Sequence, residues 1–113
     1  LYSTDEFINN HSQIIERYLQ SLVQAEKYAK ENDAEIKNFI AKTLNYDDTY
    51  INYIWPKSNH YIALEQELLI LMENEARWII QNKITEKTKV PNYFDYINSI
   101  VLSKIKPEAV IIR

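Results

Sequence analysis

The sequence contains no cysteine and no glycine among its 113 residues. Without cysteine there is no disulfide, no thiol nucleophile and no thiolate metal site, and the redox compartment stays undetermined. Without glycine, the phosphate-binding loop, the dinucleotide-binding fingerprint and the nucleophile elbow cannot form in their standard versions, because each needs a residue that lacks a side chain. These two absences argue against most nucleotide-dependent enzymes.

Positive charge is not in excess, and long hydrophobic runs are missing. Lys and Arg number 13 and Asp and Glu number 16, so the formal net charge is −3. A mildly acidic chain lacks the attraction to a phosphate backbone that nucleic-acid binding needs, and we expect no nucleic-acid partner. No apolar run approaches the ~20 residues of a membrane-spanning helix.

What is present is the composition of a globular segment. Hydrophobic residues make up 46% and charged residues 26% of the chain, and its length is that of one domain at most. The chain begins at Leu1 rather than Met and shows no signal peptide, so we expect it to be a segment of a longer protein.

Helical periodicity runs through most of the chain and predicts a mainly α fold of about five helices with a short extended segment. A brief first element follows Ser3, its expected N-cap. Asn10 is expected to cap a long helix that runs from about residue 11 to residue 31. Inside this helix, Glu26 and Lys30 are spaced for an i,i+4 ion pair.

Turn-forming residues divide the next part of the chain. Asp33 is expected to cap a short helix that runs to about residue 44, and Asn45 is expected to take the left-handed conformation after it. Asp47 is expected to cap a third helix through residue 54. Pro56 is expected to end this helix and to push Trp55 away from helical geometry.

The second half of the chain contains two further helical patterns. Residues 60–63 are expected to be extended, and a helix with a broad apolar arc is expected over residues 64–82. Leu71 and Trp78 widen that arc, so we expect the helix to pack between two neighbours. A last helix is expected from residue 91 to residue 105, followed by an apolar tail at residues 109–112 that resembles a strand covered on both sides.

Candidate catalytic and metal-binding residues are few. His11 and His60 are far apart in sequence and have no second ligand type at metal spacing, so a structural role is the favoured interpretation for both. Four carboxylates lie on the helix at 64–82, where an exposed, solvated face is the favoured interpretation. They are Glu65, Glu67, Glu73 and Glu75, and Glu73 is spaced to pair with Arg77. We therefore expect no catalytic residue, no metal site and no cofactor, and we do not expect an enzyme.

Aromatic residues are the most suggestive class. The chain has nine tyrosines and two tryptophans, and several of them gather between residues 46 and 61: Tyr46, Tyr50, Tyr53, Trp55 and Tyr61. Such a group can form a platform for a sugar or a cation. The alternative, which we favour, is a packing stripe at the edge of a core.

The order of these pieces resembles the C-terminal part of the solute-binding proteins of bacterial ABC importers of the nitrate/sulfonate/taurine and thiamine-precursor type. The resemblance covers nearly the whole chain, and the segments that carry it are residues 6–10, 17–19, 25–32, 40–47, 75–78, 90–93 and 106–110. The sequence departs from the family at His11, where the family often has proline, and at Asn45, where it often has glycine.

This resemblance implies that residues 1–113 are a single helical segment of a two-lobe α/β fold, the type II periplasmic-binding-protein fold. It implies non-catalytic recognition of a small molecule outside the cytoplasm, with an ABC permease as partner and with this segment as lobe scaffold. No family ligand motif can be matched position by position, so the ligand-binding residues stay unknown. As scaffold residues, Leu68 and Trp78 are each expected to contribute about 3 kcal/mol to stability.

Two alternatives of other classes stay open. The segment can belong to the ligand-sensing domain of a membrane-bound sensor kinase, or it can be a freestanding helical module that binds a protein through its aromatic patch and apolar tail. As an isolated piece with unpaired apolar faces, it is also expected to be able to form a homodimer.

Overall fold

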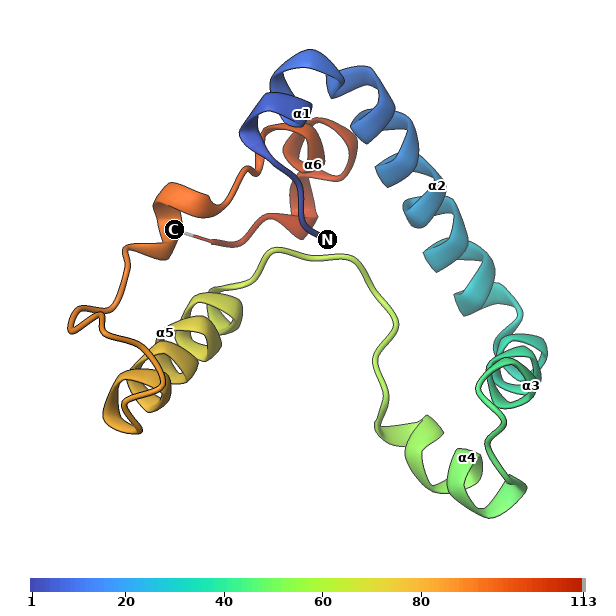
Figure 1. Cartoon of the computed structure of the whole chain (residues 1–113). Helices are drawn as coiled ribbons and strands as arrows, with labels where there is room; N and C mark the ends of the chain where they lie inside the picture. The colour runs from blue at the N-terminus through green and yellow to red at the C-terminus, as the bar shows by residue number, and fades with distance from the viewer. Residues whose placement is uncertain (113) are drawn as a thin grey trace. The chain divides into compact units, whose positions relative to one another are not determined.

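The computed structural model describes residues 1–112 and is mainly helical, as predicted, with 68% of these residues in helices. In chain order the α-helices are α1 (Asp5–Asn10), α2 (Ser12–Glu31), α3 (Asp33–Thr43), α4 (Asp48–Ile54), α5 (Gln66–Gln81) and α6 (Ile100–Ile105) (Figure 1). The 3-10 helices are η1 (Trp55–Lys57), η2 (Tyr93–Tyr96) and η3 (Pro107–Ala109). Within residues 1–112 there is no β-strand, and β-pairing is limited to one isolated bridge.

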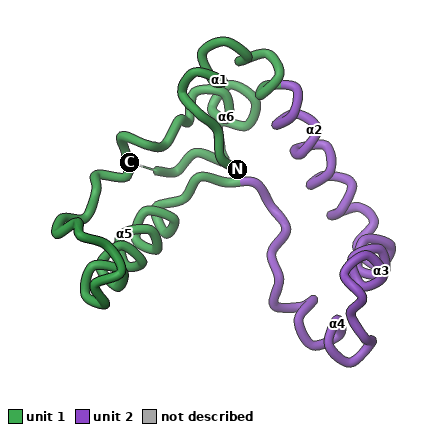
Figure 2. Tube along the Cα trace, in the orientation of Figure 1, with its two compact units in different colours: residues 1–16, 63–113 green, residues 17–62 purple. Residues whose placement is uncertain are grey.

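Two compact units make up the chain (Figure 2). Unit 1 contains residues 1–16 and the described residues from Ala63 onward, and unit 2 contains Arg17–Ile62. Helix α2 starts in unit 1, and its residues from Arg17 onward belong to unit 2. Each unit is described by itself below.

Unit 2 confirms two of the predicted turn residues. Asn45 follows α3 with a φ of 55°, the left-handed conformation that asparagine tolerates well. Asp47 caps α4, because its carboxylate accepts a hydrogen bond of 2.7 Å from the backbone N–H of Tyr50. Ile51, one turn further along α4, is the buried apolar residue of this unit.

The cap at Asp47 gives a first testable prediction. Asp47→Ala leaves the backbone N–H of Tyr50 without its side-chain acceptor and is expected to lower the free energy of unfolding by about 1 kcal/mol. Asp48→Ala is the matched control, since it removes an equal charge from the first turn of α4 but no cap, and we expect it to cost only about 0.3 kcal/mol. Urea denaturation followed by circular dichroism measures both, and equal losses would contradict the cap.

Two other predictions for unit 2 are wrong. Asn32, not Asp33, occupies the N-cap position of α3, and Asp33 is the first helical residue. Trp55 keeps helical angles (φ −56°, ψ −47°), because Pro56 enters the first positions of a 3-10 turn, where its missing N–H costs nothing. The α-helix does end at Ile54, as predicted, but the chain continues directly into η1.

The first helices also begin at different residues than expected. Thr4, not Ser3, is the N-cap of α1, with its hydroxyl oxygen 3.1 Å from the backbone nitrogen of Phe7. Asn10 is the last residue of α1 and caps nothing; the carbonyl of His11 accepts the first hydrogen bonds of α2.

The prediction of one continuous helix from residue 91 to residue 105 is also wrong. This stretch contains two separate helices, η2 and α6, of which α6 ends at Ile105 as expected. Between them, the side-chain oxygen of Asn98 accepts a hydrogen bond of 3.1 Å from the backbone N–H of Ile100. This local bond satisfies a donor without a preceding helical turn, which is how asparagine interrupts helices.

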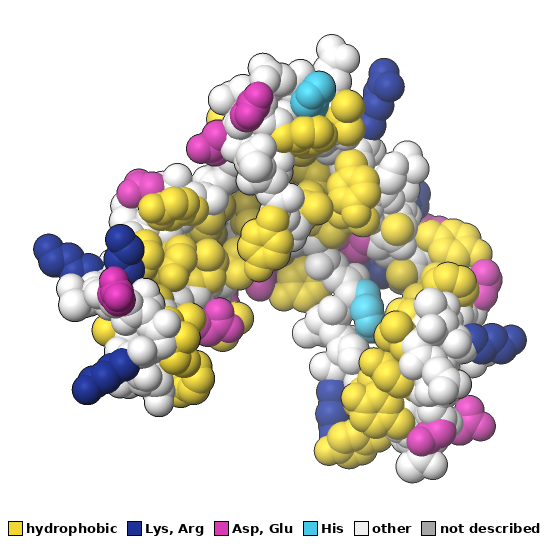
Figure 3. Space-filling model, in the orientation of Figure 1, with side chains coloured by type: hydrophobic (Ala, Val, Ile, Leu, Met, Phe, Trp, Pro, Cys, Tyr) yellow, Lys and Arg dark blue, Asp and Glu magenta, His cyan; other side chains and the backbone are white. Residues whose placement is uncertain are grey.

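In unit 1, the buried residues lie on α5, α6 and η3: Leu69, Ala76, Leu102 and Ala109. The opposite side of α5 carries Leu71 and Trp78, which are 56% and 58% exposed, and Ile70, on the flank next to them, is 53% exposed. Apolar side chains are also visible between charged ones on the face drawn in Figure 3. The expected burial of Leu71 and Trp78 is therefore wrong within the described residues, and Leu68 is half-buried. An exposed Trp78 does not support the stability contribution expected of it.

A parallel bridge joins Leu64 and Val110 in unit 1. The N–H of Leu64 donates to the carbonyl of Ala109 at 2.7 Å, and the N–H of Ile111 donates to the carbonyl of Leu64 at 2.9 Å. The expected extended segments thus pair at one point. The tail is not covered on both sides, since Ile111 is half exposed.

Candidate functional site

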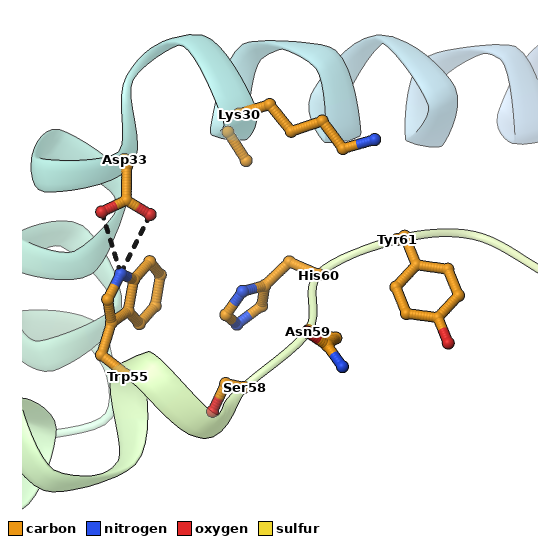
Figure 4. Close-up of a pocket in the computed structure, with 8 residues that line it drawn as sticks. Lys30, Asp33, Trp55, Ser58, Asn59, His60 and Tyr61 are labelled. Carbon is orange, nitrogen blue, oxygen red and sulfur yellow. Dashed lines mark hydrogen bonds between the residues drawn. The ribbon is translucent and has the colours of Figure 1, made fainter.

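A cavity of about 320 Å³ lies within unit 2, where the end of α2, the start of α3, η1 and the following segment meet (Figure 4). Its volume is at the lower end of the range for small-molecule sites. The residues that line it are Ala29, Lys30, Asp33, Trp55, Ser58, Asn59, His60 and Tyr61.

Asp33 and Trp55 form the first fixed contact of this cavity. The indole Nε1–H of Trp55 donates to both carboxylate oxygens of Asp33, at 3.0 and 3.1 Å. The bond joins η1 to the first turn of α3 and holds the carboxylate in one orientation. Among the described residues, no Lys or Arg forms a salt bridge with Asp33.

His60 forms the second contact. Its ring stacks on the indole of Trp55, with ring centroids 4.5 Å apart and an interplanar angle of 28°. His60 therefore lines a cavity together with a carboxylate that sequence reasoning treated only as a helix cap. No group of three His, Cys, Asp or Glu residues in the described part of the chain is placed to hold a metal ion.

Glu26 does not line the cavity but bonds to Lys30, which does. It is only 9% exposed, one of its carboxylate oxygens accepts from the Lys30 ammonium at 2.8 Å, and the other accepts from the backbone N–H of Ile62 at 2.9 Å. The predicted Glu26–Lys30 pair is confirmed. The bond to Ile62 adds a second role, because it ties α2 to the extended segment that carries His60 and Tyr61.

The five aromatic residues predicted as one group between residues 46 and 61 lie in three different environments. Tyr46 and Tyr50 meet edge to face with centroids 4.8 Å apart. The Lys57 ammonium lies 3.3 Å from the ring centre of Tyr53, so a cation of the chain itself occupies this ring. Trp55 and Tyr61 line the cavity. Thus only the last two are placed around a ligand-sized space together.

The remaining candidate residues lie outside this cavity. The ring of His11 contacts that of Phe7 at the junction of α1 and α2 in a tilted arrangement, with centroids 4.7 Å apart and an interplanar angle of 41°. Glu73 pairs with Arg77 at 2.8 Å, as predicted, and Glu67 and Glu75 are exposed on α5. None of these side chains lines the cavity.

One tyrosine outside the cavity has a shifted pKa. Tyr28 donates a hydrogen bond of 2.9 Å to the carboxylate of Glu35. This bond, together with the negative charge of Glu35 and partial desolvation, raises the pKa of the Tyr28 phenol above its usual value. The hydrogen bond joins α2 to α3.

Comparison of the chain with protein-family models, with curated proteins and with solved structures found no match. In residues 1–112, no helix combines the length and the hydropathy needed to cross a bilayer.

Proposed function

We propose that this chain is the helical C-terminal part of a solute-binding protein of the nitrate/sulfonate/taurine and thiamine-precursor type. In such a protein it would act as scaffold of one lobe outside the cytoplasm, and the whole protein would bind a small molecule without catalysis and deliver it to an ABC permease. The observation that carries this proposal is the parallel bridge between Leu64 and Val110.

Parallel pairing supports an α/β parent for a topological reason. Two parallel segments need a crossover connection between them, which is usually helical. Here Leu64 directly precedes α5, and Val110 directly follows α6 and η3, so the chain runs extended, helical, extended. This is the order of a β-α-β unit, and purely parallel pairing is typical of sheets that helices cover on both faces. In the proposed parent, further strands would continue the pairing.

The exposed side of α5 is the second support. Ile70, Leu71 and Trp78 lie on one side of the helix, and each is more than half exposed. An apolar patch of this kind marks a surface that other protein covers. In the proposed parent, the remainder of the lobe covers it.

The mechanism that follows is population shift. A two-lobe protein exchanges between open and closed states, and its ligand binds the closed state better and shifts the population towards it. Helices that keep one lobe rigid let this lobe move as a unit. Their residues then determine stability rather than ligand affinity.

The test uses the natural gene product that contains this segment. Thermal unfolding is measured with nitrate, taurine and an aminopyrimidine, each in large excess, and with sulfate as the control anion. We expect one of the three solutes to raise the unfolding midpoint by several degrees, because a ligand at 100 times its Kd adds about 2.7 kcal/mol. In the same protein, Leu71→Ser is expected to lower the midpoint and leave the Kd for that solute unchanged.

A freestanding protein-interaction module is the second candidate, and the exposed side of α5 favours it as well. It predicts that no solute changes the midpoint and that Leu71→Glu abolishes capture of a protein partner. Absence of any solute effect would thus overturn the solute-binding proposal.

A further inference from the structure

We infer that the cavity lined by Asp33, Trp55, His60 and Tyr61 binds a small organic ammonium ion that carries a ring. The site lies within unit 2 and uses residues that the scaffold role does not need, so the inference goes beyond the proposed function. It stands if that proposal fails.

The sign of the ligand's charge follows from the pairing of the lining residues. The ammonium of Lys30 is already paired with the buried carboxylate of Glu26 at 2.8 Å. Figure 4 shows the Lys30 amino group directed away from Asp33. Asp33, in contrast, accepts hydrogen bonds from the neutral indole N–H of Trp55 and forms no salt bridge with a described residue. The lining therefore has one negative charge left to balance, which favours a cation.

Asp33 is also prepared to accept further hydrogen bonds. A carboxylate offers about four acceptor positions on its two oxygens. The single N–H of Trp55 lies 3.0 and 3.1 Å from these oxygens and leaves most of the positions for a ligand. Because that indole already fixes the carboxylate, a ligand that donates to it loses little additional side-chain freedom.

The rings beside Asp33 specify the rest of the ligand. Trp55 and His60 stack 4.5 Å apart, and Tyr61 also lines the cavity. Aromatic faces attract an ammonium group and stack with a planar ring. A volume of about 320 Å³ admits a single ring with a short amine arm. Benzylammonium is the simplest compound with both features.

The experiment compares three probes of nearly equal shape and different charge. The full chain is titrated with benzylammonium, benzyl alcohol and benzoate, and the indole N–H resonance of Trp55 is followed by two-dimensional NMR. We expect benzylammonium to bind about threefold or more tightly than benzyl alcohol, since both donate a hydrogen bond to the carboxylate but only the ammonium adds the attraction of an opposite charge at this exposed residue. Benzoate is expected to bind weakest.

Substitution of the carboxylate tests the residue itself. Asp33→Asn keeps an acceptor for the indole but removes the charge, and it is expected to weaken benzylammonium binding about threefold or more. Asp48→Asn makes the same change on α4, outside this cavity, and is expected to leave the Kd within about twofold. Circular dichroism confirms that each variant is folded.

Two results would overturn the inference. The first is benzoate or benzyl alcohol binding as tightly as benzylammonium, and the second is unchanged benzylammonium affinity in folded Asp33→Asn. If Asp33→Asn does not fold, the comparison of the three probes on the unsubstituted chain is by itself the test of the inference.

Discussion

Leu69→Ala is expected to lower the free energy of unfolding of the chain by about 3 kcal/mol. Leu69 is 4% exposed and lies on the buried side of α5 together with Ala76. Truncation removes the transfer free energy of the buried methyl groups and leaves a cavity that the surrounding helices fill only in part. Urea denaturation followed by circular dichroism at 222 nm measures the loss.

Leu71→Ala is the matched control, because it makes the same chemical change two residues further along the same helix. Leu71 is 56% exposed, so we expect a loss of about 0.5 kcal/mol or less in the 113-residue chain. Equal losses for the two substitutions would show that α5 does not have the buried side described here. A larger loss for Leu71 in a longer gene product would instead show that other protein covers this side.

Glu26→Ala is expected to have the second largest effect, a loss of about 2–3 kcal/mol. The substitution removes the carboxylate that bonds to the Lys30 ammonium and to the Ile62 backbone. The Ile62 N–H is part-buried in that bond, and a donor left without an acceptor costs its desolvation free energy.

Two control variants separate the bonds of Glu26. Lys30→Ala removes the ammonium, which is itself well exposed, and we expect a loss of only about 0.5 kcal/mol. Glu26→Gln keeps an acceptor for the Ile62 N–H, so its loss should fall between the other two. If Glu26→Ala costs no more than Lys30→Ala, the bond to Ile62 contributes nothing and the described role of Glu26 is wrong. Denaturation followed by Trp55 fluorescence in a Trp78→Phe background measures all three.

The helical nature of the chain and some of its helix caps and turn residues could be predicted from the sequence. Apolar periodicity depends on local spacing alone, and so do the left-handed Asn45 and the cap at Asp47. Where two adjacent residues can both serve as the N-cap of a helix, the local sequence does not determine which of them takes that position. Asn32 and Asp33 can both cap a helix, and the distant Trp55 engages the carboxylate of Asp33.

The orientation of α5 could not be predicted, because apolar residues lie nearly all around it. Leu69 and Ala76 share one side by their seven-residue spacing, and Leu71 and Trp78 share another side by the same spacing. Periodicity alone cannot choose between two such sides; the packing of η2 against α5 in unit 1 does.

The cavity was beyond sequence reasoning for a related reason. Its lining comes from two stretches that are distant in sequence, residues 29–33 and 55–61, and only the fold brings Asp33 to Trp55 and His60. The available signal was the high density of aromatic residues between 46 and 61. That signal located the region but could not tell rings around a cavity from rings packed on one another.

The bridge between Leu64 and Val110 also has a kinetic consequence. Its two hydrogen bonds join Leu64 to residues near Val110, which lie far away in sequence. The chain between them must therefore close a long loop before the bonds form. Helices nucleate in about a microsecond from local contacts, whereas such distant pairing is slow. During synthesis or refolding, α5 and α6 therefore form early, and the edges of Leu64 and Val110 stay unsatisfied until the end, open to any other extended peptide nearby.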